Sequence, residues 1–78
     1  MLELTDEEVL VEELSKLIIL LAKRDVYNGV GRVFISELSD QGYTREQVSL
    51  AIQKLRKSFR ISVVGEMIKV NFSGETNA

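Results

Sequence analysis

The chain contains no cysteine, no histidine, no proline and no tryptophan. Because a disulfide needs cysteine and a structural zinc ion needs cysteine or histidine, neither can support this fold. The same absences remove the usual nucleophile–base pairs of acyl and phosphoryl transfer. We therefore expect a protein without catalytic activity, metal or cofactor. We expect it inside the cell, in a reducing compartment, the cytoplasm or the nucleus.

Long apolar runs are absent as well. The longest, residues 17–22, is far shorter than the roughly 20 residues that span a membrane, so we expect no membrane association. With 78 residues, of which 45% are hydrophobic and 28% charged, the chain suits one small globular domain. We expect this domain over residues 1–72 and a flexible polar tail over residues 73–78.

The net charge is only −2, but the charges are unevenly distributed. Residues 1–31 carry three basic and seven acidic side chains, a net charge of −4. Residues 44–72 carry six basic and two acidic side chains, a net charge of +4. Such a polarity can orient a domain on a polyanion or on a protein partner.

Two segments begin with the same helix-start signature. Thr5 is followed by Glu8, and Thr44 by Gln47, which is the spacing of a capping box. Apolar residues then recur at helical spacing in each segment. The stripe of the first helix is Leu10, Leu14, Leu17 and Leu21, and the buried face expected after Thr44 is Val48, Ala51, Ile52, Leu55 and Phe59.

Between these helices the sequence predicts a turn, a strand and a short helix. Asn-Gly at 28–29 is a turn signal, and residues 32–35 are rich in branched and aromatic side chains, as in strands. Ser36 is expected to cap a short helix over residues 36–41. Gly42 is expected to end it from the position after the C-cap.

After the last helix the apolar period changes from 3.6 to 2. Gly65, as the first residue of a two-residue loop, predicts a hairpin with a type II′ turn. The resulting register pairs Val63 with Ile68 and Ile61 with Val70 on one face, and Ser62 with Lys69 on the other. Turn and alternation agree, which supports this pairing.

The expected order is helix, strand, helix, helix, strand, strand. A short helix, a tight turn and an amphipathic helix are the order of a helix-turn-helix, and the hairpin would be its wing. We therefore predict an α+β fold: a winged helix-turn-helix with a three-helix core and a short β-hairpin wing. Its third helix, residues 44–59, is the candidate recognition helix.

The third helix and the wing carry residue types that contact duplex DNA. Polar side chains near the start of such a helix read base edges, and cations further along contact phosphates. The expected DNA-binding residues are Arg45, Ser49, Gln53, Lys54, Arg56, Lys57, Arg60 and Lys69. Two others fit poorly, since Glu46 would repel phosphate and Leu50 is apolar on the exposed ridge.

Other interpretations stay open. Leu50, Val64 and Met67 also suit a protein-docking surface with little direct DNA binding. The cluster of Lys and Arg is equally typical of a solvated helix face. Ile19 and Leu20 lie outside the stripe of the first helix, where a homodimer could form its seam, although we expect the domain itself to cover them.

One motif runs through residues 44–70. It is a capped helix of the type T-x-E-x-V/F-x-x-A-I/L-x-x-L, then a short strand, a glycine at the wing turn and a strand ending in I-K-V. Its positions here are Thr44, Glu46, Val48, Ala51, Ile52, Leu55, Ile61, Val63, Gly65, Ile68 and Val70. This motif resembles the C-terminal winged helix of minichromosome maintenance (MCM) replicative helicases.

The resemblance implies a separately expressed module that regulates such a helicase and docks loading or activating factors, with at most weak DNA binding. The nucleotide loop and metal-binding residues of that family lie in other domains, so the resemblance implies no catalytic residue here. Small winged-helix regulators of archaeal viruses and plasmids look similar too. We thus expect duplex DNA, or proteins of a DNA-bound complex, as partners in replication or transcription.

Overall fold

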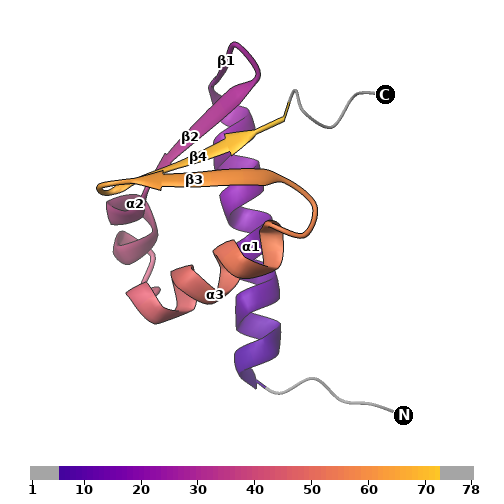
Figure 1. Cartoon of the computed structure of the whole chain (residues 1–78). Helices are drawn as coiled ribbons and strands as arrows, with labels where there is room; N and C mark the ends of the chain where they lie inside the picture. The colour runs from indigo at the N-terminus through magenta and orange to yellow at the C-terminus, as the bar shows by residue number, and fades with distance from the viewer. Residues whose placement is uncertain (1–5, 73–78) are drawn as a thin grey trace.

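The structure, a computed structural model, describes residues 6–72 and has an α+β architecture (Figure 1). Its elements are α1 (Asp6–Arg24), β1 (Val26–Tyr27), β2 (Val30–Phe34), α2 (Ile35–Asp40), α3 (Arg45–Leu55), β3 (Arg60–Val64) and β4 (Met67–Asn71). The order agrees with the expected one, apart from the additional strand β1. The expected cap at Thr5 and the tail at 73–78 lie outside the described residues.

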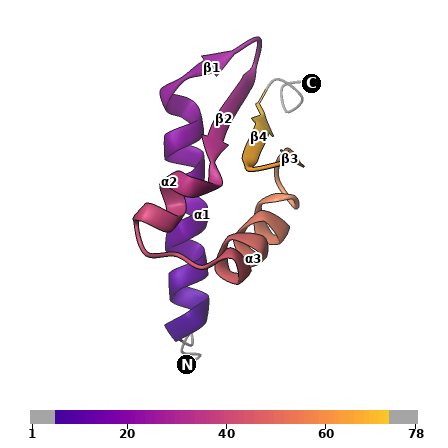
Figure 2. The same cartoon turned by 90° about the vertical axis from the view of Figure 1, so that its left-hand side faces the viewer.

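The four strands form one antiparallel sheet in the order β1-β2-β4-β3. The expected hairpin is therefore not a free wing, because β4 lies in the middle of the sheet and pairs with β2 as well as with β3. Helix α1 runs along one face of the sheet, and α3 packs against α1 below the sheet (Figures 1 and 2). No helix of residues 6–72 lies on the opposite face of the sheet.

The core lies between α1, α3 and the inner face of the sheet. Strands β2 and β4 alternate, with Val33, Ile68 and Val70 completely buried. The apolar face expected for the third helix is confirmed at its buried positions, Val48, Ala51, Ile52 and Leu55. Ile19 and Leu20 lie outside the expected apolar stripe of α1, and we expect the domain to cover both. Ile19 is half-buried, but Leu20 is 66% exposed, so this expectation is wrong for Leu20.

Gly31 lets β2 approach α1 closely. A Cβ atom at this position would lie 2.8 Å from the Cβ of Ala22 and closer still to the Ala22 carbonyl oxygen. A van der Waals contact needs more room than this. Glycine is therefore required here by the distance between strand and helix rather than by its backbone angles.

The helix ends are partly as expected. The Thr44 hydroxyl accepts a hydrogen bond from the Gln47 N–H (3.1 Å), and the Gln47 side chain accepts one from the Thr44 N–H (2.9 Å), which confirms that capping box. The cap at Ser36 is wrong, because α2 begins one residue earlier. Its N-cap is Phe34, whose N–H donates to the Glu37 carboxylate (3.2 Å).

Gly42 ends α2 as expected. Its φ of +99° is the left-handed conformation that favours glycine. The Tyr43 N–H donates to the Leu38 carbonyl (3.1 Å), and the Gly42 N–H donates to the Ser39 carbonyl (2.9 Å). These two bonds make a Schellman motif, which reverses the chain before α3.

The hairpin register is confirmed pair by pair. The φ angle of Gly65 is positive, at 62°, and that of Glu66 is not positive, as in a type II′ turn.

The third helix is shorter than expected. It ends at Leu55 instead of residue 59, and Arg56 is its C-cap. Residues 56–58 form turns that lead toward β3, and Phe59, which is partly buried, packs against the core.

Candidate nucleic-acid interface

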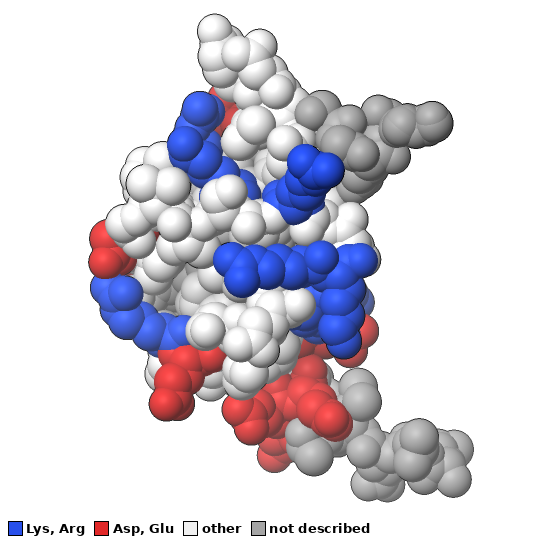
Figure 3. Space-filling view, viewed as in Figure 1, with Lys and Arg blue, Asp and Glu red and all other residues white. Residues whose placement is uncertain are grey.

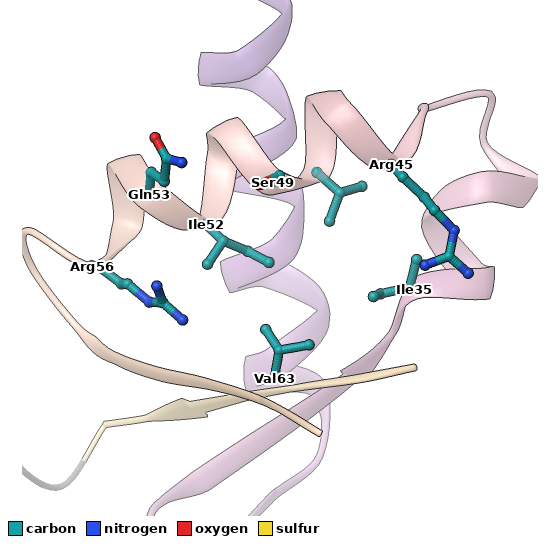
Figure 4. Close-up of a pocket in the computed structure, with 8 residues that line it drawn as sticks. Ile35, Arg45, Ser49, Ile52, Gln53, Arg56 and Val63 are labelled. Atoms are coloured by element: carbon teal, nitrogen blue, oxygen red, sulfur yellow. The ribbon is translucent and has the colours of Figure 1, made fainter. Parts of the chain in front are cut away.

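A groove between α3 and β3 contains four of the expected DNA-binding residues. It encloses about 270 Å³ and is lined by Ile35, Arg45, Val48, Ser49, Ile52, Gln53, Arg56 and Val63. Figure 4 shows Arg45 and Arg56 at its two ends, with Ser49 and Gln53 between them along the helix. Its floor is apolar and its rim on the α3 side is polar.

Helix geometry brings the polar residues together. Arg45, Ser49 and Gln53 follow one another at intervals of four residues, and Arg56 comes three residues later. Residues at these intervals share one face of a helix. Val63 closes the other side, because alternation along β3 turns it toward α3 while Ser62 and Val64 point to the opposite face.

The turn of the β3–β4 hairpin is tied to the start of the groove. The Arg45 Nη2 donates to the Glu66 Oε2 at 2.6 Å, and the Ile35 N–H donates to the Glu66 carbonyl at 2.8 Å. The hydrogen bond from Arg45 to Glu66 raises the pKa of the guanidinium above its usual value. The hairpin tip thus contacts α2 and α3, while Val64, Gly65 and Glu66 remain exposed to solvent.

Charge is distributed unevenly along the groove. Its first end has Arg45 paired with Glu66, with Glu46 in the same helical turn, whereas its other end has Arg56 followed by Lys57. In Figure 3 basic side chains lie over the sheet and α3, and a group of acidic side chains lies at the lower end of the molecule. The first turn of α1 contributes Asp6, Glu7 and Glu8 to that acidic end.

The structure brings together only half of the expected DNA-binding set. Arg45, Ser49, Gln53 and Arg56 line the groove. Lys54 lies on the other side of α3, in a second groove with Glu12 of α1. Lys57 is exposed in the turn after α3, and Arg60 and Lys69 lie on the outer face of the sheet, away from the groove.

The expected docking residues do not form one surface. Leu50 is 39% exposed and lies in the second groove, which includes neither Val64 nor Met67. Val64 is 55% exposed, as expected for the wing tip. Met67 is only half-buried rather than freely exposed, because it lies between Phe34 of β2 and Val64 of β3.

Two residues that line the groove, Ile35 and Val63, are not among the expected site residues. The sequence predicts Ile35 in a strand, Val63 on the hairpin face that it shares with Ile68, and Glu66, which pairs with Arg45, only in the turn. The place of Ile35 and Val63 in the groove depends on how the hairpin packs against α2 and α3, for which no local pattern exists. The alternation of β3 did give the orientation of Val63 toward the helices.

Some kinds of site are absent from the described part of the chain. Over residues 6–72, no group of three or more His, Cys, Asp or Glu side chains is arranged to hold a metal ion. No helix within the same residues is long and apolar enough to cross a bilayer. Compared with models of protein families, with curated proteins and with solved structures, the chain matches none.

Proposed function

We propose that this chain is a winged-helix module that binds duplex DNA, with α3 as the recognition helix, in DNA replication or transcription. The observation that carries the proposal is the row of Arg45, Ser49, Gln53 and Arg56 along one exposed edge of α3. A helix of this kind fits the major groove, where Ser and Gln can hydrogen-bond base edges and Arg can contact bases or phosphates.

The roles follow from position along the helix. Ser49 and Gln53 lie in the middle of the row, and both side chains are exposed, so they are the proposed base-reading residues. Arg56 and Lys57 lie beyond them and are the proposed phosphate contacts, since cations that flank a reading helix fix its register on the duplex. Lys54, Arg60 and Lys69 are not part of this set in our proposal, because they lie on other surfaces.

The winged-helix assignment is supported by the order of the elements, by the tight turn between α2 and α3, and by the hairpin that packs beside α3. The turn of this hairpin contacts α2 and α3 through Glu66. The likeness of residues 44–70 to the helicase domain lies mostly in cap and core positions, so a place in a replicative complex is part of the proposal and rests on that motif alone.

Protein docking is the second candidate, and the groove between α1 and α3 favours it. This groove is lined by Val11 and Leu50 on its apolar side, and by Glu7, Glu8 and Glu12. An apolar anchor with basic neighbours would complement it. A homodimer through α1 also stays a prediction, with Leu20 as its exposed apolar residue.

The test is the affinity for a dye-labelled duplex of mixed sequence, measured by fluorescence anisotropy at low salt and again at higher salt. We expect binding that falls steeply with salt, because each phosphate contact releases counterions. Arg56→Glu should weaken binding strongly. Lys16→Glu, which makes the same charge change on α1, should have a much smaller effect. If both variants bind as the wild type does, the groove is not the DNA-binding surface.

A further inference from the structure

The outer face of the sheet is a second exposed surface with its own chemistry. Strands β1 to β4 contain no Asp or Glu, and no helix covers this face. Its middle row consists of Arg32, Lys69 and Ser62, which are paired side by side across three strands. The face therefore carries positive charge without any acidic side chain from the strands.

Aromatic rings lie on both sides of this basic row. Phe34, two residues after Arg32 on β2, is 49% exposed, and Tyr27 of β1, paired with Val30, is 65% exposed. Val30 and Phe34 are four residues apart on one strand, so the two rings are separated by roughly 13 Å along the sheet, given the rise of about 3.3 Å per residue. Arg32 and Lys69 therefore lie between two exposed aromatic rings.

We propose that this outer face binds single-stranded nucleic acid. Exposed bases can stack on the rings of Tyr27 and Phe34, while Arg32 and Lys69 contact the phosphates between them. Arg60, the first residue of β3 and on the same face, extends the basic path. A duplex cannot use the rings in this way, because its base faces are already stacked on one another.

A single strand fits this face better than a protein partner does. Three basic side chains and no acidic one from the strands complement a polyanion, whereas the centre of a protein interface is usually depleted of charged residues. The face is also separate from the groove between α3 and β3, since neighbouring residues of β3 point to opposite sides: Val63 into the groove, Ser62 and Val64 outward. The inference does not depend on the proposed duplex binding.

The experiment measures binding of a dye-labelled thymidine oligonucleotide of about 12 nucleotides, a length within the range of known single-strand sites. Tyr27→Ala removes the ring at a position exposed enough to leave the fold intact, which circular dichroism would verify. We expect the affinity to fall at least about fivefold, the lower end of what one stacked base contributes. Tyr27→Phe keeps the ring and should bind like the wild type.

The charged row gives a second readout. Arg32→Gln should lower the slope of log affinity against log salt by about 0.7, the value for one phosphate contact on a single strand. Lys16→Gln, on α1, is the matched control and should leave the slope unchanged. Neither Tyr27→Ala nor Arg32→Gln should change duplex affinity, whereas Arg56→Glu should change duplex affinity alone.

Several results would overturn the inference while leaving the duplex proposal standing. The first is wild-type protein that does not bind the oligonucleotide at low salt. The second is a Tyr27→Ala variant that binds it as tightly as Tyr27→Phe does. The third is a wild-type dimer in sedimentation experiments that Tyr27→Ala dissociates, since the face would then be an interface between copies of this chain.

Discussion

Arg45 and Glu66 join the first turn of α3 to the tip of the β3–β4 hairpin through a hydrogen-bonded ion pair of 2.6 Å. The two residues are 21 positions apart in sequence. Together with the bond from the Ile35 N–H to the Glu66 carbonyl, this pair holds the hairpin against the helices. It also places a carboxylate at the end of the groove where DNA would lie, so Glu66 opposes the proposed function of Arg45.

Replacing Glu66 should therefore strengthen duplex binding. Glu66→Gln removes a negative charge from the groove and frees Arg45 for a phosphate, which should steepen the salt slope by up to about 0.9. The pair is largely exposed, so little change in stability is expected. The control is Glu13→Gln on α1, which changes net charge equally. A gain in affinity that is the same for both variants would mean that only net charge matters.

The two sides of α3 should differ in their contribution to duplex binding. Arg56 lies in the groove between α3 and β3 with Gln53, whereas Lys54 lies in the groove between α1 and α3 with Glu12. We expect Arg56→Glu to weaken binding and to lower the salt slope by about 1, and Lys54→Glu to have the smaller effect. Anisotropy titrations at two salt concentrations compare them. The reverse order would place the nucleic acid on the α1 side of the helix.

The pH dependence of stability should contain a contribution from Glu37. The hydrogen bond from Arg24 (3.0 Å), and next the one from the Phe34 N–H, lowers the pKa of this carboxyl below 4.5. A lowered folded-state pKa stabilises the protein above the unfolded value, and this stabilisation disappears as pH falls through the folded-state pKa. At this exposure we expect less than about 1 kcal/mol.

Unfolding by urea at pH 7 and at about pH 3 tests this, since the second value lies below the ordinary pKa of glutamate. Wild type should be slightly more stable than Glu37→Gln at pH 7, and the difference should shrink in acid, disappearing below the folded-state pKa of Glu37. Glu13→Gln is the control for the loss of one carboxylate. A wild-type advantage that persists in acid would show that Arg24 and Glu37 are not coupled through ionisation.

Gly31 should tolerate no side chain. Gly31→Ala would push a methyl group into the backbone of Ala22, and such overpacking costs about 1–3 kcal/mol. The control is Arg32→Ala, the next residue of β2, which faces outward and should change the free energy of unfolding by at most about 0.5 kcal/mol. Equal effects of the two substitutions would contradict the close approach of β2 to α1.

The sequence was sufficient for features with a local cause. The capping box of Thr44 and Gln47, the termination at Gly42 and the register around Gly65 each depend on a few neighbouring residues, and all three are confirmed. The buried face of α3 follows from its period, and it is confirmed too. Boundaries were less accurate. Helix α2 starts at Ile35 with Phe34 as its N-cap and the Glu37 carboxylate accepting from the Phe34 N–H, so Ser36 lies inside the helix.

Features that depend on long-range packing could not be predicted. Nothing near Met67 indicates that β2, more than 30 residues earlier in the chain, pairs with β4 and half-buries that side chain. For the same reason, helical periodicity predicts a single exposed ridge along α3. In the structure, the hairpin packs on one side of this ridge and α1 on the other, so its residues line two separate grooves. Gln53 and Arg56 face the first groove, and Leu50 and Lys54 the second.

Amide NMR spectra of the labelled protein, recorded while a short mixed-sequence duplex is added at low salt, test the central claim most directly. We predict shifts concentrated on Arg45, Ser49, Gln53 and Arg56, reversed by raising the salt, with α1 unaffected. Shifts that gather around Leu50 and the first half of α1 would contradict the account. A spectrum that does not change at low salt would contradict it as well, and would leave the groove between α1 and α3 as the stronger candidate for a protein partner.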